Sequence, residues 1–247
     1  MKGLAFAFAG GSAVLLACAV HDDTTFPNWP QPTETTPPVR TVGGPLDDAG
    51  AGGVDPGGTT NTGVGITSIG TGYYHACAVV NGGLQCWGDD YYGQLGDNST
   101  TDKHVPVQVL GAKSGVAAVV GGADHTCALV NGGVQCWGFN DHGQLGDNST
   151  SDRHVPVQVA GLTAGVAAIS AGAGQNCALV SGGVQCWGHK NWDVPDDNST
   201  TDTYVPVAVS GLTSGVTAVA AGSHTCAVVN GGAQCWGSNF VSVRRSA

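Results

Sequence analysis

The chain repeats itself at intervals of 50 residues. Each of four units opens with a glycine, and these glycines are Gly65, Gly115, Gly165 and Gly215. A period of about 20 to 50 residues is the sequence signature of a propeller or a solenoid, in which each unit buries its apolar face against the next. This repeat constrains the fold more strongly than any other feature of the sequence.

Four short, apolar-biased segments lie within a unit, separated by Gly or by Asn and Asp turns. In the second unit they are VAAVV at Val116, HTCALV at His125, VQCWG at Val134 and VPVQV at Val155. Such segments predict strands, and no stretch of the sequence has a sustained helical period. Four short antiparallel strands make one propeller blade. The sequence therefore predicts an all-β domain over residues 65–247, with about four blades that start near residues 65, 115, 165 and 215.

The middle two strands of a unit form a β-hairpin around an Asn-Gly turn. Asn131-Gly132 favours a type I′ turn, which needs positive φ at both positions. Pairing outward from this turn places Cys127 opposite Cys136 at a non-hydrogen-bonded pair, where the Cα atoms come closest. That distance suits a disulfide. One such bond is expected in each blade: Cys77–Cys86, Cys127–Cys136, Cys177–Cys186 and Cys226–Cys235.

The first residues, MKGLAFAFAGGSAVLLACAV, have the features of an export signal. Lys2 supplies a positive charge, and the apolar stretch that follows is too short to span a bilayer. The stretch ends in LLAC, which resembles the lipobox of bacterial lipoproteins, although Leu16 is a less usual residue at its position. The resemblance implies a signal peptide over residues 1–17, a lipid on Cys18, and an exported protein anchored at the cell envelope, in the outer membrane or at the cell surface. An ordinary cleaved signal peptide or a short buried segment is the alternative.

The cysteine count agrees with lipidation. The chain has nine cysteines, and a lipid on Cys18 leaves eight, which fall into the four hairpin pairs. An exported protein meets the oxidising conditions that disulfides require. Reduced core cysteines are the alternative, and a zinc site fits less well because no C-x-x-C pair is present.

Residues 18–64 differ in composition from the repeats. They are rich in Pro, Thr, Gly and Asp and lack periodicity, so they cannot bury enough apolar surface to offset the entropy of ordering. We expect a disordered tether that holds the repeats away from the membrane. The whole chain has a net charge of −10 and only 8 Lys and Arg residues, which excludes the dense basic surface of a nucleic-acid-binding protein.

Several ordered elements of the second unit match a known repeat. They are Gly122 with His125, the Asn-Gly-Gly hairpin turn, Trp137-Gly138, and GQLG at residues 143–146. Together these elements resemble the regulator of chromosome condensation repeat, and the resemblance covers about residues 65–237. It implies a propeller, typically of seven blades. The family includes a nuclear nucleotide-exchange factor for a small GTPase and secreted bacterial propellers, one of which inhibits β-lactamases.

The third and fourth units depart from this pattern. The third has Gln175 in place of the histidine, and WDVPDD from Trp192 in place of HGQLGD. The fourth is one residue shorter and continues as SNFVSVRRSA without a fourth strand, so the last blade is expected to be incomplete. Four blades cannot close a ring shaped for seven, which leaves sheet edges exposed. A homo-oligomer that completes the propeller, a small closed ring and a shortened relic of a seven-bladed protein are the three interpretations.

The loops after the first and third strands of each unit lie on one face of the domain, opposite the hairpin turns. The hairpin turns are nearly uniform among the units, whereas the opposite loops vary and carry rings. Aromatic and adaptable polar side chains are typical of loops that recognise proteins. The candidate partner-binding residues are Tyr73, Tyr74, Tyr91, Tyr92, Phe139, His142, His189, Trp192 and Phe240. Variable loops without a ligand are the alternative.

Three acidic strings suggest calcium, namely DNSTTD at Asp97, DNSTSD at Asp147 and DNSTTD at Asp197. Carboxylates and hydroxyls are suitable ligands, but the strings lack the glycine and the distal Glu of an EF-hand loop. Asx and Ser/Thr turns account for them more simply. We expect neither a metal nor a cofactor.

His75, His125 and His224 each precede a hairpin cysteine by two positions. The same histidine recurs in several blades, whereas a catalytic site is usually single, so structural hydrogen bonds are expected rather than a Ser-His-Asp site. The sequence thus predicts a non-enzymatic cell-envelope lipoprotein whose propeller loops bind a protein partner of unknown identity. The alternatives are an exported hydrolase and, by family analogy alone, a nucleotide-exchange factor or an enzyme inhibitor.

Overall fold

The computed structural model describes residues 65–189, 201–222 and 224–237. The predicted signal peptide, Cys18 and the tether lie outside the described residues, as do Trp192 and Phe240. The described part consists of strands and turns without a helix, so it includes no helix able to cross a membrane.

Four antiparallel sheets follow one another along the chain, and within each sheet neighbouring strands are consecutive in the sequence. The first contains β1 (Ile66–Thr71), β2 (His75–Val80), β3 (Gly83–Gly88) and β4 (Lys103–Gln108). The second contains β5 (Val116–Gly121), β6 (His125–Val130), β7 (Gly133–Gly138) and β8 (Arg153–Gln158). The third contains β9 (Val166–Ala171), β10 (Gln175–Val180), β11 (Gly183–Gly188) and β12 (Thr203–Ala208). The fourth contains β13 (Val216–Ala221), β14 (His224–Val229) and β15 (Gly232–Gly237).

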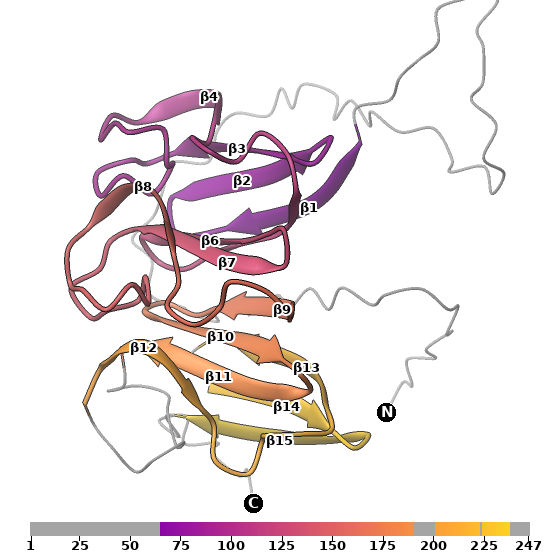
Figure 1. Cartoon of the computed structure of the whole chain (residues 1–247). Coiled ribbons are helices and arrows are strands. Elements are labelled where there is room, and N and C mark those ends of the chain that lie inside the picture. The colour runs from indigo at the N-terminus through magenta and orange to yellow at the C-terminus, as the bar shows by residue number, and fades with distance from the viewer. Residues whose placement is uncertain (1–64, 190–200, 223, 238–247) are drawn as a thin grey trace, which may run out of the picture. The chain divides into compact units, whose positions relative to one another are not determined.

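This arrangement confirms the predicted all-β blades with an incomplete last blade (Figure 1). Strand bounds differ from the prediction by one or two residues. β8 begins at Arg153 rather than at Val155, because Gly138 pairs with Arg153 beyond a register shift near the end of β7. The bulge keeps the outer strand paired while its partner strand turns into the next loop.

The hairpins form with the predicted register. Asn131 and Gly132 have φ values of 51° and 81°, as a type I′ turn requires. The turn places Cys127 opposite Cys136 with a Cα–Cα distance of 4.1 Å, and their sulfur atoms are bonded. The other three predicted pairs form disulfides in the same way. The turn therefore fixes the register, and the register brings the cysteines together.

Each blade presents two different faces to its neighbours. In the second blade the Cys face carries Cys127, Leu129, Val134 and Cys136, and the Trp face carries Thr126, Ala128, Gln135 and Trp137. The Cys face of one blade packs against the Trp face of the next. The first core cluster thus joins Cys77, Val79, Leu84 and Cys86 of the first blade to Ala128 and Trp137 of the second. The same packing recurs between the second and third blades and between the third and fourth.

The four sheets do not close into a ring. The Cys face of β14 and β15 has no described blade packed against it, and Cys235 is exposed there whereas Cys136 is fully buried. On the first blade, Ile66 and Ile69 of β1 are 60% and 59% exposed. The homo-oligomer that would cover such faces stays a prediction.

Candidate functional site

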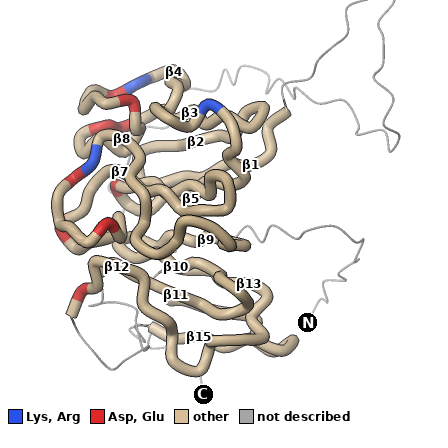
Figure 2. The backbone as a smooth tube through the Cα atoms, in the orientation of Figure 1, with Lys and Arg blue, Asp and Glu red and all other residues tan. Residues whose placement is uncertain are grey.

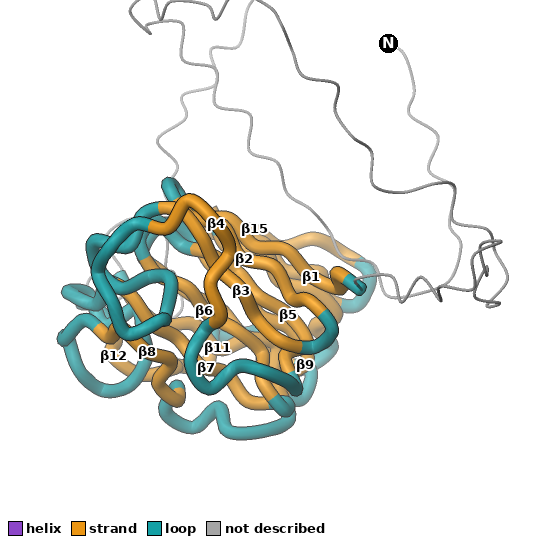
Figure 3. Tube along the Cα trace, turned by 90° about the horizontal axis from the view of Figure 1, so that it is seen from above, coloured by secondary structure: helices purple, strands orange, loops and turns teal. Residues whose placement is uncertain are grey.

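In the first and second blades, two loops lie at one end of the sheet, opposite the hairpin turns. They are the short loop after the first strand and the long loop after the third strand, which spans residues 89–102 in the first blade and 139–152 in the second. Because neighbouring strands are antiparallel, these loops must share one side of the domain. Figure 3 shows them gathered at one side of the described residues. We call this side the loop face.

The long loop of the second blade is held in shape by its own buried polar side chains. The Oδ1 atom of Asn140 accepts a hydrogen bond from the Leu145 N–H at 2.9 Å, and the Oε1 atom of Gln144 accepts one from the His142 N–H at 2.9 Å. Gly143 has a φ of 72°, and a Cβ placed on it would lie 2.8 Å from the Cα of Tyr204 in β12. The GQLG string therefore lets the loop lie directly on the next blade.

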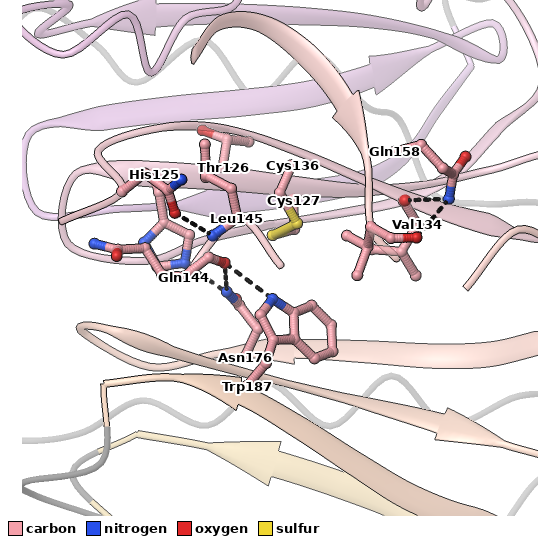
Figure 4. The surroundings of a disulfide bond; sticks show 12 residues. His125, Thr126, Cys127, Val134, Cys136, Gln144, Leu145, Gln158, Asn176 and Trp187 are labelled. Atoms are coloured by element: carbon pink, nitrogen blue, oxygen red, sulfur yellow. Dashed lines mark hydrogen bonds between the residues drawn. A yellow bond between two sulfur atoms is a disulfide. The ribbon is translucent and has the colours of Figure 1, made fainter. Parts of the chain in front are cut away.

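A buried hydrogen-bond network joins the long loop of one blade to the hairpin of the next. Asn176 and Trp187 of the third blade both donate to the backbone carbonyl of Gln144, at 2.7 and 3.0 Å (Figure 4). The Asn176 amide nitrogen is thus the donor, so its Oδ1 accepts from His125 Nε2 at 3.1 Å. The network leaves His125 as the neutral tautomer with hydrogen on Nε2.

The preceding interface has the same network with a different residue. Thr126 and Trp137 donate to the carbonyl of Gln94 at 2.8 and 2.9 Å, and His75 Nε2 donates to Thr126 Oγ1 at 2.9 Å. At the third interface Gln175 Nε2 donates to Thr225 Oγ1 at 2.7 Å. Gln175 replaces the histidine because its amide also presents an N–H at the tip of the side chain.

These histidines are structural. Burial lowers the pKa of His75 to about 4, with a further contribution from His125, and burial lowers the pKa of His125 to about 4. Both side chains are therefore neutral at pH 7 and bound to the neighbouring blade. This agrees with the structural interpretation of the sequence, with the difference that the partner lies in the next blade. His224, by contrast, is exposed.

Five of the predicted partner-binding rings form one continuous row on the loop face. The ring centroids are 4.8 Å apart for Tyr91–Tyr92, 4.7 Å for Tyr92–Phe139, 6.4 Å for Phe139–His142 and 4.0 Å for His142–His189. These distances are those of interacting ring pairs. We call this row, which draws on loops of three blades, the ring ladder.

The remaining predicted rings are not part of the ladder as described. Tyr73 and Tyr74 form a separate pair with centroids 6.4 Å apart, and both are largely exposed. Trp192 and Phe240 lie outside the described residues. The structure thus brings together five of the nine predicted residues across blade boundaries.

Carboxylates surround the ring ladder. Asp124, Asp141 and Asp152 all act electrostatically on Tyr92. Burial raises the pKa of Asp124, and the nearby charge of Asp89 raises it further. Among the described residues, the acidic ones gather on the loops in Figure 2. The loop face therefore presents rings within a negative field.

The two described acidic strings are turns rather than open ligand sets. The Oδ1 atom of Asp97 accepts from the Ser99 N–H at 2.9 Å, and Asp97 pairs with Lys103 at 3.4 Å. Asp147 likewise accepts from the Ser149 N–H at 3.1 Å and pairs with Arg153 at 2.9 Å. The predicted Asx turns account for these carboxylates.

Sequence reasoning missed one residue of the loop face. Asp202, at the end of the third acidic string, bonds to His142 of the preceding blade with a distance of 2.8 Å between Asp202 Oδ2 and His142 Nδ1. The two residues are 60 positions apart. No local pattern signals this contact, because it depends on how the long loop of one blade lies on the next.

The sequence matches the family description "Regulator of chromosome condensation (RCC1) repeat" over residues 81–129 and 131–179. A second model with the same description matches residues 66–94 and 116–144. Each of the longer matches runs from the hairpin turn of one blade to the second strand of the next, and so spans the junction between two blades. No curated protein matches the chain.

Solved structures with the same fold include human WBSCR16, with 22% identity and a TM-score of 0.64, over 72% of this chain and 48% of that one. Yeast RCC1 (Prp20) bound to Kap60 matches with 23% identity and a TM-score of 0.61, over 70% and 44% of the two chains. Prp20p from Saccharomyces cerevisiae matches with 23% identity and a TM-score of 0.60, over 70% and 45%.

The chain spans about half the length of these structures. At such identities the likeness establishes the fold, and the family models identify the repeats over residues 66–179. Residues 66–179 of the chain thus carry regulator of chromosome condensation (RCC1) repeats, and the described residues have the fold of RCC1-type β-propeller blades.

Proposed function

We propose that this chain is an exported, lipid-anchored protein that binds a basic segment of a protein partner on its loop face. The ring ladder carries the proposal, because loops from three blades place five rings in one row among carboxylates. An arrangement that spans three separate loops offers a continuous contact surface rather than isolated exposed side chains.

The chemistry of the loop face favours a cationic ligand. A Lys or Arg side chain over the face of a tyrosine or phenylalanine is attracted by the ring, and nearby carboxylates add to that attraction. Tyr91 is 71% exposed and available for such a contact. The net charge of −10 would speed the approach of a basic partner and oppose that of a nucleic acid.

Support for export comes from the disulfides and from the N-terminal motif. Four disulfides in a chain of 247 residues suit an oxidising compartment. The LLAC motif at Cys18 supplies a lipidation site for such a protein. Labelling growing cells with a radioactive fatty acid would test this part, with Cys18→Ser as the control that should lose the label.

Protein binding agrees with what is known of one structural relative. Prp20p was described with its binding properties to Gsp1p and histones, so a propeller of this fold can carry surfaces for protein partners. Nucleotide exchange is the alternative function that the family suggests. Export argues against it, because an exported protein would not encounter a cytosolic GTPase. An exported hydrolase is the other alternative, and the two best-buried histidines do not favour it because both are neutral and engaged with the next blade.

Binding of peptides to the purified chain tests the proposal. We expect Lys- and Arg-rich peptides to bind. The double variant Tyr91→Ser/Phe139→Ser should lower their affinity at least tenfold, because both substitutions interrupt the ring ladder. Tyr73→Ser/Tyr74→Ser is the matched control, since it removes two exposed rings outside the ladder and should change the affinity less than twofold. Equal binding of acidic peptides, or an equal loss in both variants, would contradict the proposal.

A further inference from the structure

Two histidines and one aspartate meet where the second blade contacts the third. His142 comes from the long loop of the second blade, His189 follows β11, and Asp202 directly precedes β12. Their ligand atoms all lie within 4.8 Å of one another. The rings of His142 and His189 are themselves in contact, with centroids 4.0 Å apart.

Both imidazoles direct the same nitrogen at one carboxylate. His142 Nδ1 lies 2.8 Å from Asp202 Oδ2, and His189 Nδ1 lies 3.4 Å from Asp202 Oδ1. The Nδ1 atom of His189 is shielded from solvent and has no hydrogen-bond partner among the described residues. A buried imidazole nitrogen that faces a carboxylate without a hydrogen bond is unusual and calls for another partner.

We propose that His142, His189 and Asp202 bind a first-row divalent transition-metal ion, of which Zn²⁺ is the preferred case. Two neutral imidazoles and one carboxylate are common ligands of zinc and of its first-row neighbours. Calcium and magnesium are excluded by the ligand set, because both take mainly oxygen ligands.

One of the present distances equals that between two ligand atoms of a bound ion. Zinc lies about 2.0–2.2 Å from its nitrogen and oxygen ligands, so two ligand atoms of a tetrahedral site are about 3.3–3.5 Å apart. The 3.4 Å between His189 Nδ1 and Asp202 Oδ1 already has this value. The His142 ring must move for its nitrogen to reach the same ion, and its position permits this because 41% of its side chain is exposed.

Binding requires His142 to change its tautomer. In the metal-free protein the His142 Nδ1–H donates to Asp202 Oδ2. When the ion binds, the Nδ1 proton passes to solvent, the Nδ1 lone pair coordinates the metal, and Nε2 takes up one proton from solvent, so the ring changes tautomer, stays neutral and releases no net proton. The exposed edge of His142 leaves the fourth coordination position open to water or to a partner's side chain.

The neighbouring interface provides an internal control. Shifted by 50 residues along the chain, the positions of His142, His189 and Asp202 become Tyr92, Phe139 and Asp152. There Tyr92 and Phe139 pack ring on ring at 4.7 Å, and Asp152 lies close enough to Tyr92 to act on it electrostatically. The same backbone arrangement therefore holds two rings without a metal-binding nitrogen at one interface and two histidines at the next.

Metal titration of the full chain, with its disulfides intact and its metal removed by chelation, tests the site. We expect one Zn²⁺ per chain by calorimetry, and Co²⁺ in its place should give the visible absorption of a tetrahedral site with nitrogen ligands. His142→Tyr/His189→Phe, which copies the first interface, should weaken binding at least tenfold. Asp202→Asn should weaken binding as well.

The reciprocal substitution gives a gain that general damage to the fold cannot imitate. Tyr92→His/Phe139→His should create a second site with Asp152 and raise the stoichiometry from one ion to two. Equal binding of Zn²⁺ by the native chain and by His142→Tyr/His189→Phe would overturn the proposal, as would an absence of binding at micromolar Zn²⁺. No partner protein enters this test, so its outcome is independent of the proposed function.

Discussion

The interface between the first and second blades and the interface between the second and third share one buried layer and differ at their rims. In the buried layer a tryptophan of one blade donates to the glutamine carbonyl in the long loop of the blade before it, at 2.9 Å in the first interface and 3.0 Å in the second. At the rim, Tyr92 and Phe139 of the first interface are replaced by His142 and His189 in the second.

The difference separates what the fold requires from what it tolerates. A buried N–H or C=O group without a partner costs about 1–3 kcal/mol, so both of these interfaces keep the tryptophan N–H paired with the glutamine carbonyl. Side chains at the rim are only partly buried, so their replacement costs less than a change in the buried layer. The chemistry of the loop face can therefore change from one interface to the next while the packing stays the same.

The largest expected effect lies in the shared layer. Trp137→Ala and Trp187→Ala should each lower the free energy of unfolding by about 3–5 kcal/mol, because each removes a buried indole. Trp87 lies on the outer Trp face of the first blade and is only partly buried, so Trp87→Ala should cost less than half as much. Urea unfolding of the three variants measures this. A clear difference between Trp137→Ala and Trp187→Ala would break the equivalence of the two interfaces.

A smaller effect is expected from pH. His75 and His125 have pKa values of about 4 in the folded chain, against an ordinary value of 6.5. Between these values the unfolded chain binds more protons, so stability is complete above about pH 6.5 and falls as the pH drops toward 4. The loss is up to about 3 kcal/mol for each histidine, since one pKa unit corresponds to about 1.4 kcal/mol.

Substitution by glutamine isolates this contribution from the carboxylates that titrate in the same range. Gln175 already takes the histidine's place at the third interface, so His75→Gln/His125→Gln should keep the bonds to the next blade. Thermal unfolding followed from pH 7 to pH 4 should show a flatter decline in this variant than in the native chain. Parallel declines would mean that the two histidines do not control the acid sensitivity of the interfaces.

The smallest effect concerns rates rather than stability. Cys127–Cys136 lies inside a covered interface, whereas Cys235 is exposed on a face that no described blade covers. A mild reductant should therefore open Cys226–Cys235 first, because thiolate attack needs access to a sulfur atom. Alkylation followed by peptide mass spectrometry gives the order of reduction. Simultaneous opening of all four bonds would show that the last face is covered like the others.

Much of the blade could be predicted from the sequence because it depends on local chemistry. The Asn131-Gly132 turn sets the hairpin register, and the register alone determines that Cys127 meets Cys136. The rings of the loop face could also be identified, since the loops that vary among the units are visible in the repeat. Their order in the ladder could not, because Tyr92 meets Phe139, and His142 meets His189, only where one blade lies on the next.

By itself, the sequence determined the repeat, the strands, the turns and the four disulfides, all of which arise from residues within about 50 positions of one another. Only the tertiary structure decided which side chains meet between blades. It joined His75 to Thr126 at a separation of 51 residues and His142 to Asp202 at a separation of 60. The physical reason is that a propeller's interfaces are built from whole sheets packed face to face. Contacts across them depend on the rotation between neighbouring sheets, which no local sequence pattern determines.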